Sequence, residues 1–436
     1  MSEAKTDHPS APVDHARNWL QMAGAAAIAA PAPVLRLLEI TGLVEIHLEP
    51  WVESVIFGIS IMAAATLLVW ASEVAEQLVS ATLALAVLAI IAVLPEYAVD
   101  LYFAWQAGAE LGLDPSMFDP TEARPVELAL ANMTGANRLL IGFAWPLVFF
   151  LFWFKTRKTQ LSVGKTNAIG LIFLAVAALY SFSIPFKESL SLIDSGVLIS
   201  LFGLYLIMSS KSPPSEHELM GPAVSIAELT PKLKWAAVIG IFVFAAGVVF
   251  AAAEPFANGL VETGESFGID EFLLVQWVAP LASESPEFIL AALMALRGRA
   301  GAAMTLLIAS KVNQWTLLVG SLPIAFSISG GTLDALPVEG RQANEVFLTA
   351  AQSLFAVAVL LNLRFGLREA LLILVLFSIQ LAIPIDEVRV GFGVLYILLA
   401  IGWTVRERGE IPPLWRHARV AAGGIASGDA NGQGEH

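Results

Sequence analysis

The stretch from Ala282 to Gly320 is apolar enough to lie in a lipid bilayer, yet it contains charged side chains. A charged group at the centre of a bilayer costs roughly 2.5–3.5 kcal/mol on insertion scales, so residues of this kind are usually functional. A fainter copy of the pattern lies at 92–142. Two polar-interrupted hydrophobic hairpins at matching places in two halves of a chain indicate the binding site of a secondary transporter. The polar residues of the first stretch are Ser283, Glu284, Glu287, Lys311, Asn313 and Gln314.

The composition excludes several classes of protein. Of the 436 residues 57% are hydrophobic and only 14% are charged, whereas a soluble domain is about 25% charged. A net charge of −14 argues against a nucleic-acid partner, which calls for a basic surface. The absence of cysteine excludes disulfides and thiolate metal sites. No glycine-rich phosphate loop is present, so we expect no coupling to ATP hydrolysis within this chain.

Apolar segments long enough to cross a membrane recur along the chain, since a spanning helix needs about 20 mostly apolar residues. The segment 19–41 contains two prolines, and either spans or lies on the surface. The segment 345–363 is read as one additional span. We therefore predict 10–12 transmembrane helices, and the ten principal ones lie at 54–73, 79–106, 126–154, 165–185, 191–210, 233–253, 270–296, 301–328, 367–384 and 388–404.

The charges of the loops predict the topology, because cytoplasmic loops carry an excess of lysine and arginine. If the span at 54–73 runs inward, and 345–363 is a span, every basic loop is cytoplasmic and every acidic loop lies outside. We therefore expect an integral protein of the cell (inner or plasma) membrane with a cytoplasmic C-terminus. The basic loops are Lys155–Lys158, Arg297–Arg299, Arg364–Arg368 and Arg406–Arg419, and the acidic loops are 108–122, 254–270 and Asp386–Glu387.

In this topology the two halves of the chain start on opposite sides of the membrane, as in the inverted repeats of secondary transporters. The predicted fold class is an all-α polytopic membrane protein with two inverted five-helix repeats plus one or two additional helices. The predicted regions are a polar N-terminus with the segment 19–41 (1–53), a first repeat (54–210), a cytoplasmic linker (211–232), a second repeat that includes the additional span (233–404) and a basic, partly disordered cytoplasmic tail (405–436).

Pro95-Glu96 and Pro286-Glu287 place a proline and a carboxylate together inside two apolar segments. Proline leaves a backbone carbonyl without its helical partner, and a membrane tolerates such a group where it lines a polar cavity. Two carboxylates from opposed helices make a hard-oxygen site that suits calcium, sodium or protons. The structural alternative is a proline kink whose glutamate pairs with an arginine.

Both stretches resemble the alpha-repeats of the sodium/calcium exchanger family, within the calcium/cation antiporter superfamily. Each family repeat reads roughly G-[ST]-S-x-P-E and then G-N-x-x-G-S-N-x-x-[ND]. The resemblance implies two inverted five-helix halves, with the site on the second and third helices of each. It assigns Glu96 and Glu287 as cation ligands. The sequence 131–137 resembles G-N-x-x-G-S-N, and 309–311 occupies G-S-N.

The last position of the family motif is filled by Gln314 in the second repeat. In the first repeat strict counting places Leu140 there, whereas a one-residue gap places Asn137 there. We prefer Asn137, because an apolar side chain offers no oxygen to a cation.

The sequence also departs from the family motif. Ala92 and Val93 replace two hydroxyl residues in the first repeat, whereas the second repeat has Ser283 and Glu284. Lys311 stands where the family has a neutral asparagine, and its ammonium repels a bound cation. One hypothesis makes Lys311 a counter-ion of Glu284 or Glu287, which leaves fewer cation sites and a proton-coupled or monovalent cycle. The other is that Lys311 extends to the interface or forms a silent salt bridge.

These observations predict a secondary-active antiporter that moves Ca²⁺ or another cation in exchange for Na⁺ or H⁺ by alternating access. The alternatives are a Na⁺/H⁺ or K⁺/H⁺ antiporter with a reduced site, and a structural relative that does not transport. We expect neither an enzyme nor a cofactor, and partners limited to membrane lipid and the transported inorganic cations; the oligomeric state stays open. The predicted ligands are Glu96, Glu287, Asn137, Ser283, Glu284, Ser310 and Gln314, supported by Asn132, Lys311, Asp100 and Asn313.

Overall fold

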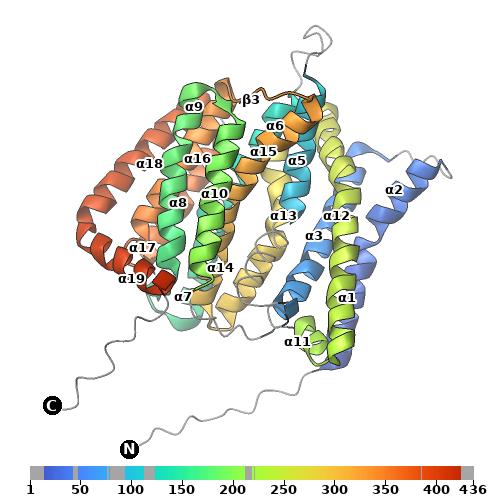
Figure 1. The fold of residues 1–436 in the computed structure, drawn as a ribbon, viewed down its shortest axis with the longest axis horizontal. Coiled ribbons are helices and arrows are strands. Elements are labelled where there is room, and N and C mark those ends of the chain that lie inside the picture. The colour runs from blue at the N-terminus through green and yellow to red at the C-terminus, as the bar shows by residue number, and fades with distance from the viewer. Residues whose placement is uncertain are drawn as a thin grey trace, which may run out of the picture.

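The computed structural model describes residues 14–42, 48–75, 78, 94–111, 123–211, 219, 221–383 and 385–423. These residues form a bundle of helices that run roughly side by side (Figure 1), with two small two-stranded sheets. The part of the predicted span 79–106 that precedes residue 94 lies outside the described residues. This part includes Ala92 and Val93.

The elements of the first half follow the predicted order. Two helices that form one candidate span cover the segment 19–41, and the third helix of the repeat is interrupted by a π-helix. The elements are α1 (His15–Ala29), α2 (Pro31–Thr41), α3 (Pro50–Ala75), α5 (Leu94–Ala109), α6 (Pro125–Leu139), η2 (Leu140–Ala144), α7 (Trp145–Thr156), β1 (Gln160–Ser162), α8 (Asn167–Ser181), α9 (Ser183–Lys187), β2 (Ser189–Leu190) and α10 (Leu192–Ser209).

The second half begins after a short helix in the predicted linker, and its third helix is interrupted by a π-helix in the same way. The elements are α11 (Pro222–Ala227), α12 (Pro231–Phe267), α13 (Glu271–Leu296), α14 (Ala300–Asn313), η3 (Gln314–Leu318), α15 (Val319–Gly330), β3 (Leu336–Pro337), α16 (Gly340–Val359), β4 (Arg364–Gly366), α17 (Leu367–Ala382), α18 (Asp386–Arg406), η4 (Arg408–Glu410) and α19 (Ile411–Gly423).

Seven helices of the described chain are long and apolar enough to cross a membrane, or eight if the two parts of α13 count as one span. Those parts, Glu271–Glu284 and Glu287–Leu296, meet at an angle of 53°. The sequence has Pro286 at this place, and proline is the usual cause of so sharp a bend. The other long elements, α5, α14–α15, α16 and α17, run alongside these helices (Figure 1).

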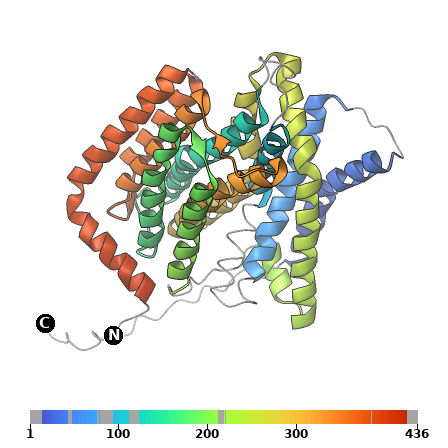
Figure 2. The same cartoon turned by 45° about the horizontal axis from the view of Figure 1, so that its top comes forward.

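The contacts between helices relate the two halves by an inverted symmetry. Helix α10 packs on α15 and η3, and α17 packs on α7 and η2. In the same way α8 packs on α14, whereas α16 packs on α6. By these contacts α16, which covers most of the predicted additional span at 345–363, corresponds to α8. Helix α18 packs along α16 at one edge of the bundle, and α3 and α12 lie toward the other edge (Figure 2).

Three of the predicted basic loops gather at one end of the bundle, whereas the predicted acidic loop 254–270 is mostly the C-terminal part of α12, and most of 108–122 lies outside the described residues. Strand β1 pairs with β4, and Lys155 Nζ donates a hydrogen bond to the Leu296 carbonyl, so three basic loops meet at one end. Helix α19 lies at this end (Figure 1). Strand β2 pairs with β3 at the opposite end, where Arg341 NH1 lies 2.7 Å from Asp270 Oδ2. We call these the basic end and the acidic end.

Helices α6 and α13 approach each other closely at Gly135. A Cβ atom added to Gly135 would lie 1.8 Å from the Gln276 carbonyl oxygen, which belongs to the backbone. Small residues at such crossings allow membrane helices to pack by direct backbone contact. Gly135 therefore sets the distance between these two helices.

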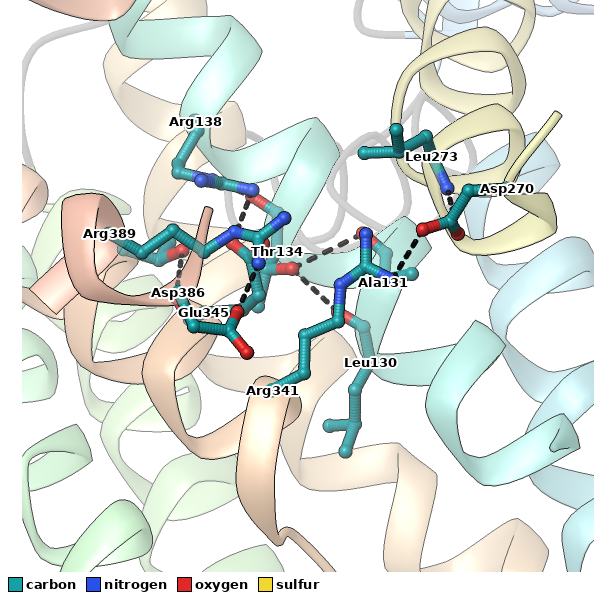
Figure 3. Close-up of polar contacts among 11 residues, drawn as sticks. Leu130, Ala131, Thr134, Arg138, Asp270, Leu273, Arg341, Glu345, Asp386 and Arg389 are labelled. Atoms are coloured by element: carbon teal, nitrogen blue, oxygen red, sulfur yellow. Dashed lines mark hydrogen bonds and ion pairs between the residues drawn. The ribbon is translucent and has the colours of Figure 1, made fainter. Parts of the chain in front are cut away.

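A buried cluster of charges connects α6, α16 and α18 (Figure 3). Glu345 Oε2 lies 2.5 Å from Arg138 NH2, and Glu345 Oε1 lies 2.7 Å from Arg389 Nε. Arg389 also pairs with the more exposed Asp386, and the Arg138 guanidinium lies 4.9 Å from the Trp277 ring centroid. The side chains of Arg138, Glu345 and Arg389 are at most 5% exposed. Water therefore cannot replace Glu345 as the partner of either guanidinium.

We predict that Glu345→Gln destabilises the folded protein by about 3–5 kcal/mol, because two buried guanidinium groups lose their shared carboxylate. The unfolding transition of the purified protein in detergent measures this effect. The matched control is Glu339→Gln at an exposed position on the same helix end, which should change stability by about 0.5 kcal/mol or less. Equal stabilities of the two variants would contradict the prediction.

We also predict that Gly135→Ala lowers stability, although alanine is intrinsically the better helix former by about 1 kcal/mol. The new methyl group has to displace the backbone of α13. The control is Gly203→Ala on α10, where an added Cβ meets no atom within 4 Å, and where the same substitution should be neutral or stabilising. Thermal unfolding of both variants provides the comparison, and a rise at both positions would show that α6 and α13 are not in tight contact.

Candidate cation site

Four carboxyl groups lie buried on two neighbouring helices. Glu96 and Asp100 come from α5, and Glu284 and Glu287 from α13; the helices contact each other and both pack on α6. Their exposed fractions are 1%, 0%, 2% and 3% respectively. Glu284 lies within electrostatic reach of the other three. The structure therefore brings together the two predicted central glutamates, the added carboxylate Glu284 and the supporting Asp100.

The inverted directions of α5 and α13 arrange these carboxyls in two levels. Asp100 follows Glu96 by one turn on a helix that runs toward the acidic end, and Glu284 precedes Glu287 by about one turn on a helix that starts there (Figure 1). Asp100 and Glu284 therefore both lie on the acidic-end side. We call Glu96 and Glu287 the central pair, and Asp100 and Glu284 the acidic-end pair.

Each member of the acidic-end pair has an amide partner. Asn132 Nδ2 donates to Asp100 Oδ1 at 2.7 Å, and Gln314 Nε2 donates to Glu284 Oε1 at 2.5 Å. Within the described chain the remaining oxygens, Asp100 Oδ2 and Glu284 Oε2, have no hydrogen-bond partner. Both oxygens of Glu96 and Oε2 of Glu287 are also without one. Buried carboxylate oxygens of this kind require a proton or a cation.

Lys311 is fully buried and contacts the other repeat. Its Nζ donates to Asn137 Oδ1 at 2.6 Å and to the Asn137 carbonyl at 3.1 Å, and lies 4.7 Å from the Trp315 ring centroid. The expected direct pairing with Glu284 or Glu287 is not formed among the described residues, and an exposed fraction of 0% excludes extension to the interface. Its charge acts on Glu96 and Glu284 through space instead.

The two π-helices identify which residues of the repeats correspond. They begin at Leu140 and at Gln314, and π-helical turns inside α-helices occur frequently at functional sites. With these starts aligned, Leu140 corresponds to Gln314, and Asn137 corresponds to Lys311. This alignment agrees with the strict count, which places Leu140 at the last motif position, and our preference for Asn137 there stays a prediction. That preference assumes that both repeats supply a ligand there, whereas the repeats differ chemically.

Three of the other predicted site residues, Asn137, Ser283 and Asn313, have hydrogen-bond partners within the described chain. Asn137 Oδ1 accepts from Lys311 Nζ, and Asn137 Nδ2 donates to the Met133 carbonyl at 2.8 Å, so both ends of the amide are engaged within the protein in this arrangement. Ser283 Oγ donates to the Ala279 carbonyl at 3.2 Å within its own helix. Asn313 Oδ1 accepts from the Tyr97 hydroxyl at 3.1 Å. Ser310 Oγ and Gln314 Oε1 are buried and without a hydrogen-bond partner in the part of the chain that the structure describes.

The cluster is not a closed coordination shell. No group of three or more acidic, histidine or cysteine side chains converges to hold a metal among the described residues. The oxygens that remain available belong to the central pair, the acidic-end pair, Asn132, Ser310 and Gln314. Such a loose set suits a cation that binds and leaves.

Two contributors were not selected from the sequence. Tyr97 follows Glu96 directly and connects α5 to Asn313 of α14. Arg138 follows Asn137 directly and carries a positive charge near Lys311. Arg138 is a charged residue in an apolar helix, which is the signal that identified Lys311. Applied evenly, that rule would have selected Arg138 as well.

Known structures and family models extend these observations. No curated protein matches the chain. A structure described as the H⁺/Ca²⁺ exchanger CAX has 39% sequence identity and a TM-score of 0.86, over 94% of this chain and 99% of that one. Native YfkE (16% identity, TM-score 0.55, 86% and 99% coverage) and the sodium-calcium exchanger NCX_Mj (19%, 0.51, 76% and 98%) share the fold.

The family model described as sodium/calcium exchanger protein matches residues 50–211 and 237–385, which is most of the chain and includes both repeats. The matched segments contain the central pair, the acidic-end pair and Lys311. On this match and on the 39% identity, the chain belongs to the sodium/calcium exchanger family of membrane cation transporters, within the calcium/cation antiporter superfamily.

Proposed function

We propose that the chain exchanges Ca²⁺ for protons at the four-carboxyl cluster by alternating access. The observation that carries the proposal is that five of the eight carboxyl oxygens are buried without a hydrogen-bond partner among the described residues. Four carboxylates and the Lys311 ammonium would sum to a charge of −3 in a low-dielectric site, which is prohibitive. Protons or a divalent cation must compensate this charge, so that the arrival of one favours the release of the other.

The ligand chemistry favours calcium as the substrate, because Ca²⁺ is bound by several carboxylate and carbonyl oxygens in flexible geometry. It favours protons over sodium as the coupling ion, since Lys311 occupies the Asn137 oxygen and Ala92 and Val93 lack hydroxyls. The 39% identical relative is described as an H⁺/Ca²⁺ exchanger, which supports the same pair of ions.

A Na⁺/H⁺ or K⁺/H⁺ antiporter is the second candidate. The observation that favours it is Lys311 itself, whose ammonium takes a place inside the cluster that a second cation charge would need. In that case one monovalent cation, rather than one divalent cation, would exchange with protons at the remaining oxygens.

The bent and interrupted helices fit alternating access. Helix α13 bends between Glu284 and Glu287, and η2 and η3 interrupt the third helices of the repeats. Discontinuous helices at the midplane are typical of the sites of secondary transporters. We assign the basic end to the cytoplasm of a cell membrane by the positive-inside rule, which places α19 and the C-terminal side inside.

The first test is ion flux in proteoliposomes with purified wild type and Glu287→Gln. We expect wild type to take up Ca²⁺ when an imposed gradient drives protons out of the liposomes. The uptake by the variant should fall to the level of empty liposomes. Glu387→Gln, at an exposed position in the first turn of α18, is the control. Sodium-driven Ca²⁺ flux, or proton-coupled Na⁺ or K⁺ flux without Ca²⁺ movement, would replace the proposed ion pair. No flux of any cation would indicate a relative that does not transport.

The second test is Lys311→Met, which removes the positive charge and keeps most of the volume. Carboxyls that lose a nearby ammonium hold their protons to higher pH. We therefore expect the pH of half-maximal Ca²⁺ uptake to rise. Lys165→Met in an exposed loop at the basic end is the control and should keep the wild-type profile. An unchanged pH profile and unchanged ion selectivity at Lys311→Met would make this lysine a structural residue.

A further inference from the structure

A cavity of about 330 Å³ lies between α5, α6 and α12, at the acidic end of the bundle. Its lining includes the exposed residues Arg124, Asn258, Glu262 and Glu265. Two buried apolar side chains, Phe103 and Leu128, also line it. The cavity therefore has a polar, exposed mouth and an apolar floor that faces the interior of the bundle.

One face of α5 leads from this cavity to the carboxyl cluster. Glu96, Asp100, Phe103, Gln106 and Glu110 follow one another at spacings of three or four residues, so they share a helical stripe. Phe103, Gln106 and Glu110 line the cavity. Asp100 and Glu96 continue the stripe below it and belong to the carboxyl cluster.

Helix α6 repeats this order on the facing side. Leu128 lines the cavity, and one turn further Asn132 donates its hydrogen bond to Asp100. Phe103 and Leu128 are 3% and 2% exposed. Each lies one turn above a member of the Asp100–Asn132 pair, so the two apolar side chains separate that pair from the cavity.

The far wall of the cavity is polar. The Tyr102 hydroxyl donates to Asn258 Oδ1 at 2.8 Å, and Gln106 Nε2 donates to the Tyr102 oxygen at 2.9 Å. Helix α12 has 37 residues and is therefore about 56 Å long, well beyond a hydrocarbon core of about 30 Å. Its last turns carry Glu262 and Glu265, which line the cavity and are exposed.

We infer that this cavity is the vestibule through which the cation reaches the site from the acidic end. Phe103 and Leu128 are its closed gate, and Asp100 is the first carboxylate to receive the cation. The inference rests on the proposed cation transport. The acidic residues Glu110, Glu262 and Glu265 outnumber Arg124 at the vestibule, and a cleft lined mainly by one sign of charge concentrates the opposite ion. Asp100 Oδ2, buried and without a partner, is the oxygen that would receive it.

The absence of cysteine from the chain makes the access route directly measurable. Single cysteines are introduced at Gln106 in the vestibule and at Asn132 below the gate, and the purified proteins are treated with a positively charged methanethiosulfonate reagent. We expect Gln106→Cys to react rapidly and Asn132→Cys to be protected. Adding Phe103→Ala with Leu128→Ala should make Asn132→Cys react at a rate close to that of Gln106→Cys.

The control is Phe355→Ala, which removes an equally buried phenylalanine on α16, outside the cavity lining, and should leave Asn132→Cys protected. The single alanine variants serve if the double variant fails to fold. A slow reaction at Gln106→Cys, a fast reaction at Asn132→Cys with the gate intact, or continued protection after removal of the gate would each overturn the inference.

The role of Asp100 is tested by Asp100→Asn in the flux assay. We expect the KM for Ca²⁺ supplied from the acidic end to rise by about tenfold or more, with a smaller change in the maximal rate. An unchanged KM would remove Asp100 from the route. Because cysteine reactivity does not depend on transport, a correct accessibility pattern without Ca²⁺ flux would keep the vestibule and reject only the proposed ion.

Discussion

The cost of burying negative charge governs this structure. Glu96, Asp100, Glu284 and Glu287 lie in the interior of a membrane protein with one ammonium group, Lys311, among them. Among the residues that the structure describes, the nearby Arg138 guanidinium is already paired with Glu345 and leaves Lys311 as the one cation that faces the four carboxyls. The protein therefore depends on ions from outside, either protons or metal cations, and this dependence is what an exchanger converts into transport.

The two repeats contribute different groups to the charge balance of the site. Lys311 and Asn137 are equivalent by their position before the π-helices, yet one carries a charge and the other accepts its hydrogen bonds. Likewise the acidic-end carboxylate follows the central glutamate in one repeat and precedes it in the other. Inversion of the helices brings both to the same level. An approximately symmetric backbone thus holds a site whose chemistry is directional, with its extra carboxylates on the acidic-end side only.

Much of the architecture could be predicted from the sequence, because length and apolarity are local properties. The helical spans, the sorting of loop charges and the proline bend before Glu287 are of this kind. Partners across the repeat interface are not local. Lys311 finds Asn137 rather than a glutamate, and Arg138 finds Glu345 on a helix some 200 positions further along the chain. A single sequence records that such residues are present, but not which of them meet.

The two small sheets have a mechanical consequence. Strand β1 of the first half pairs with β4 of the second at the basic end, and β2 pairs with β3 at the acidic end. Backbone hydrogen bonds thus join the two halves at both ends of the bundle. The halves cannot separate at either end without breaking one of these sheets. A change of access that keeps both sheets intact has to come from rotation about the line that joins them, or from helices toward the opposite edge of the bundle, such as α3 and α12 (Figure 2).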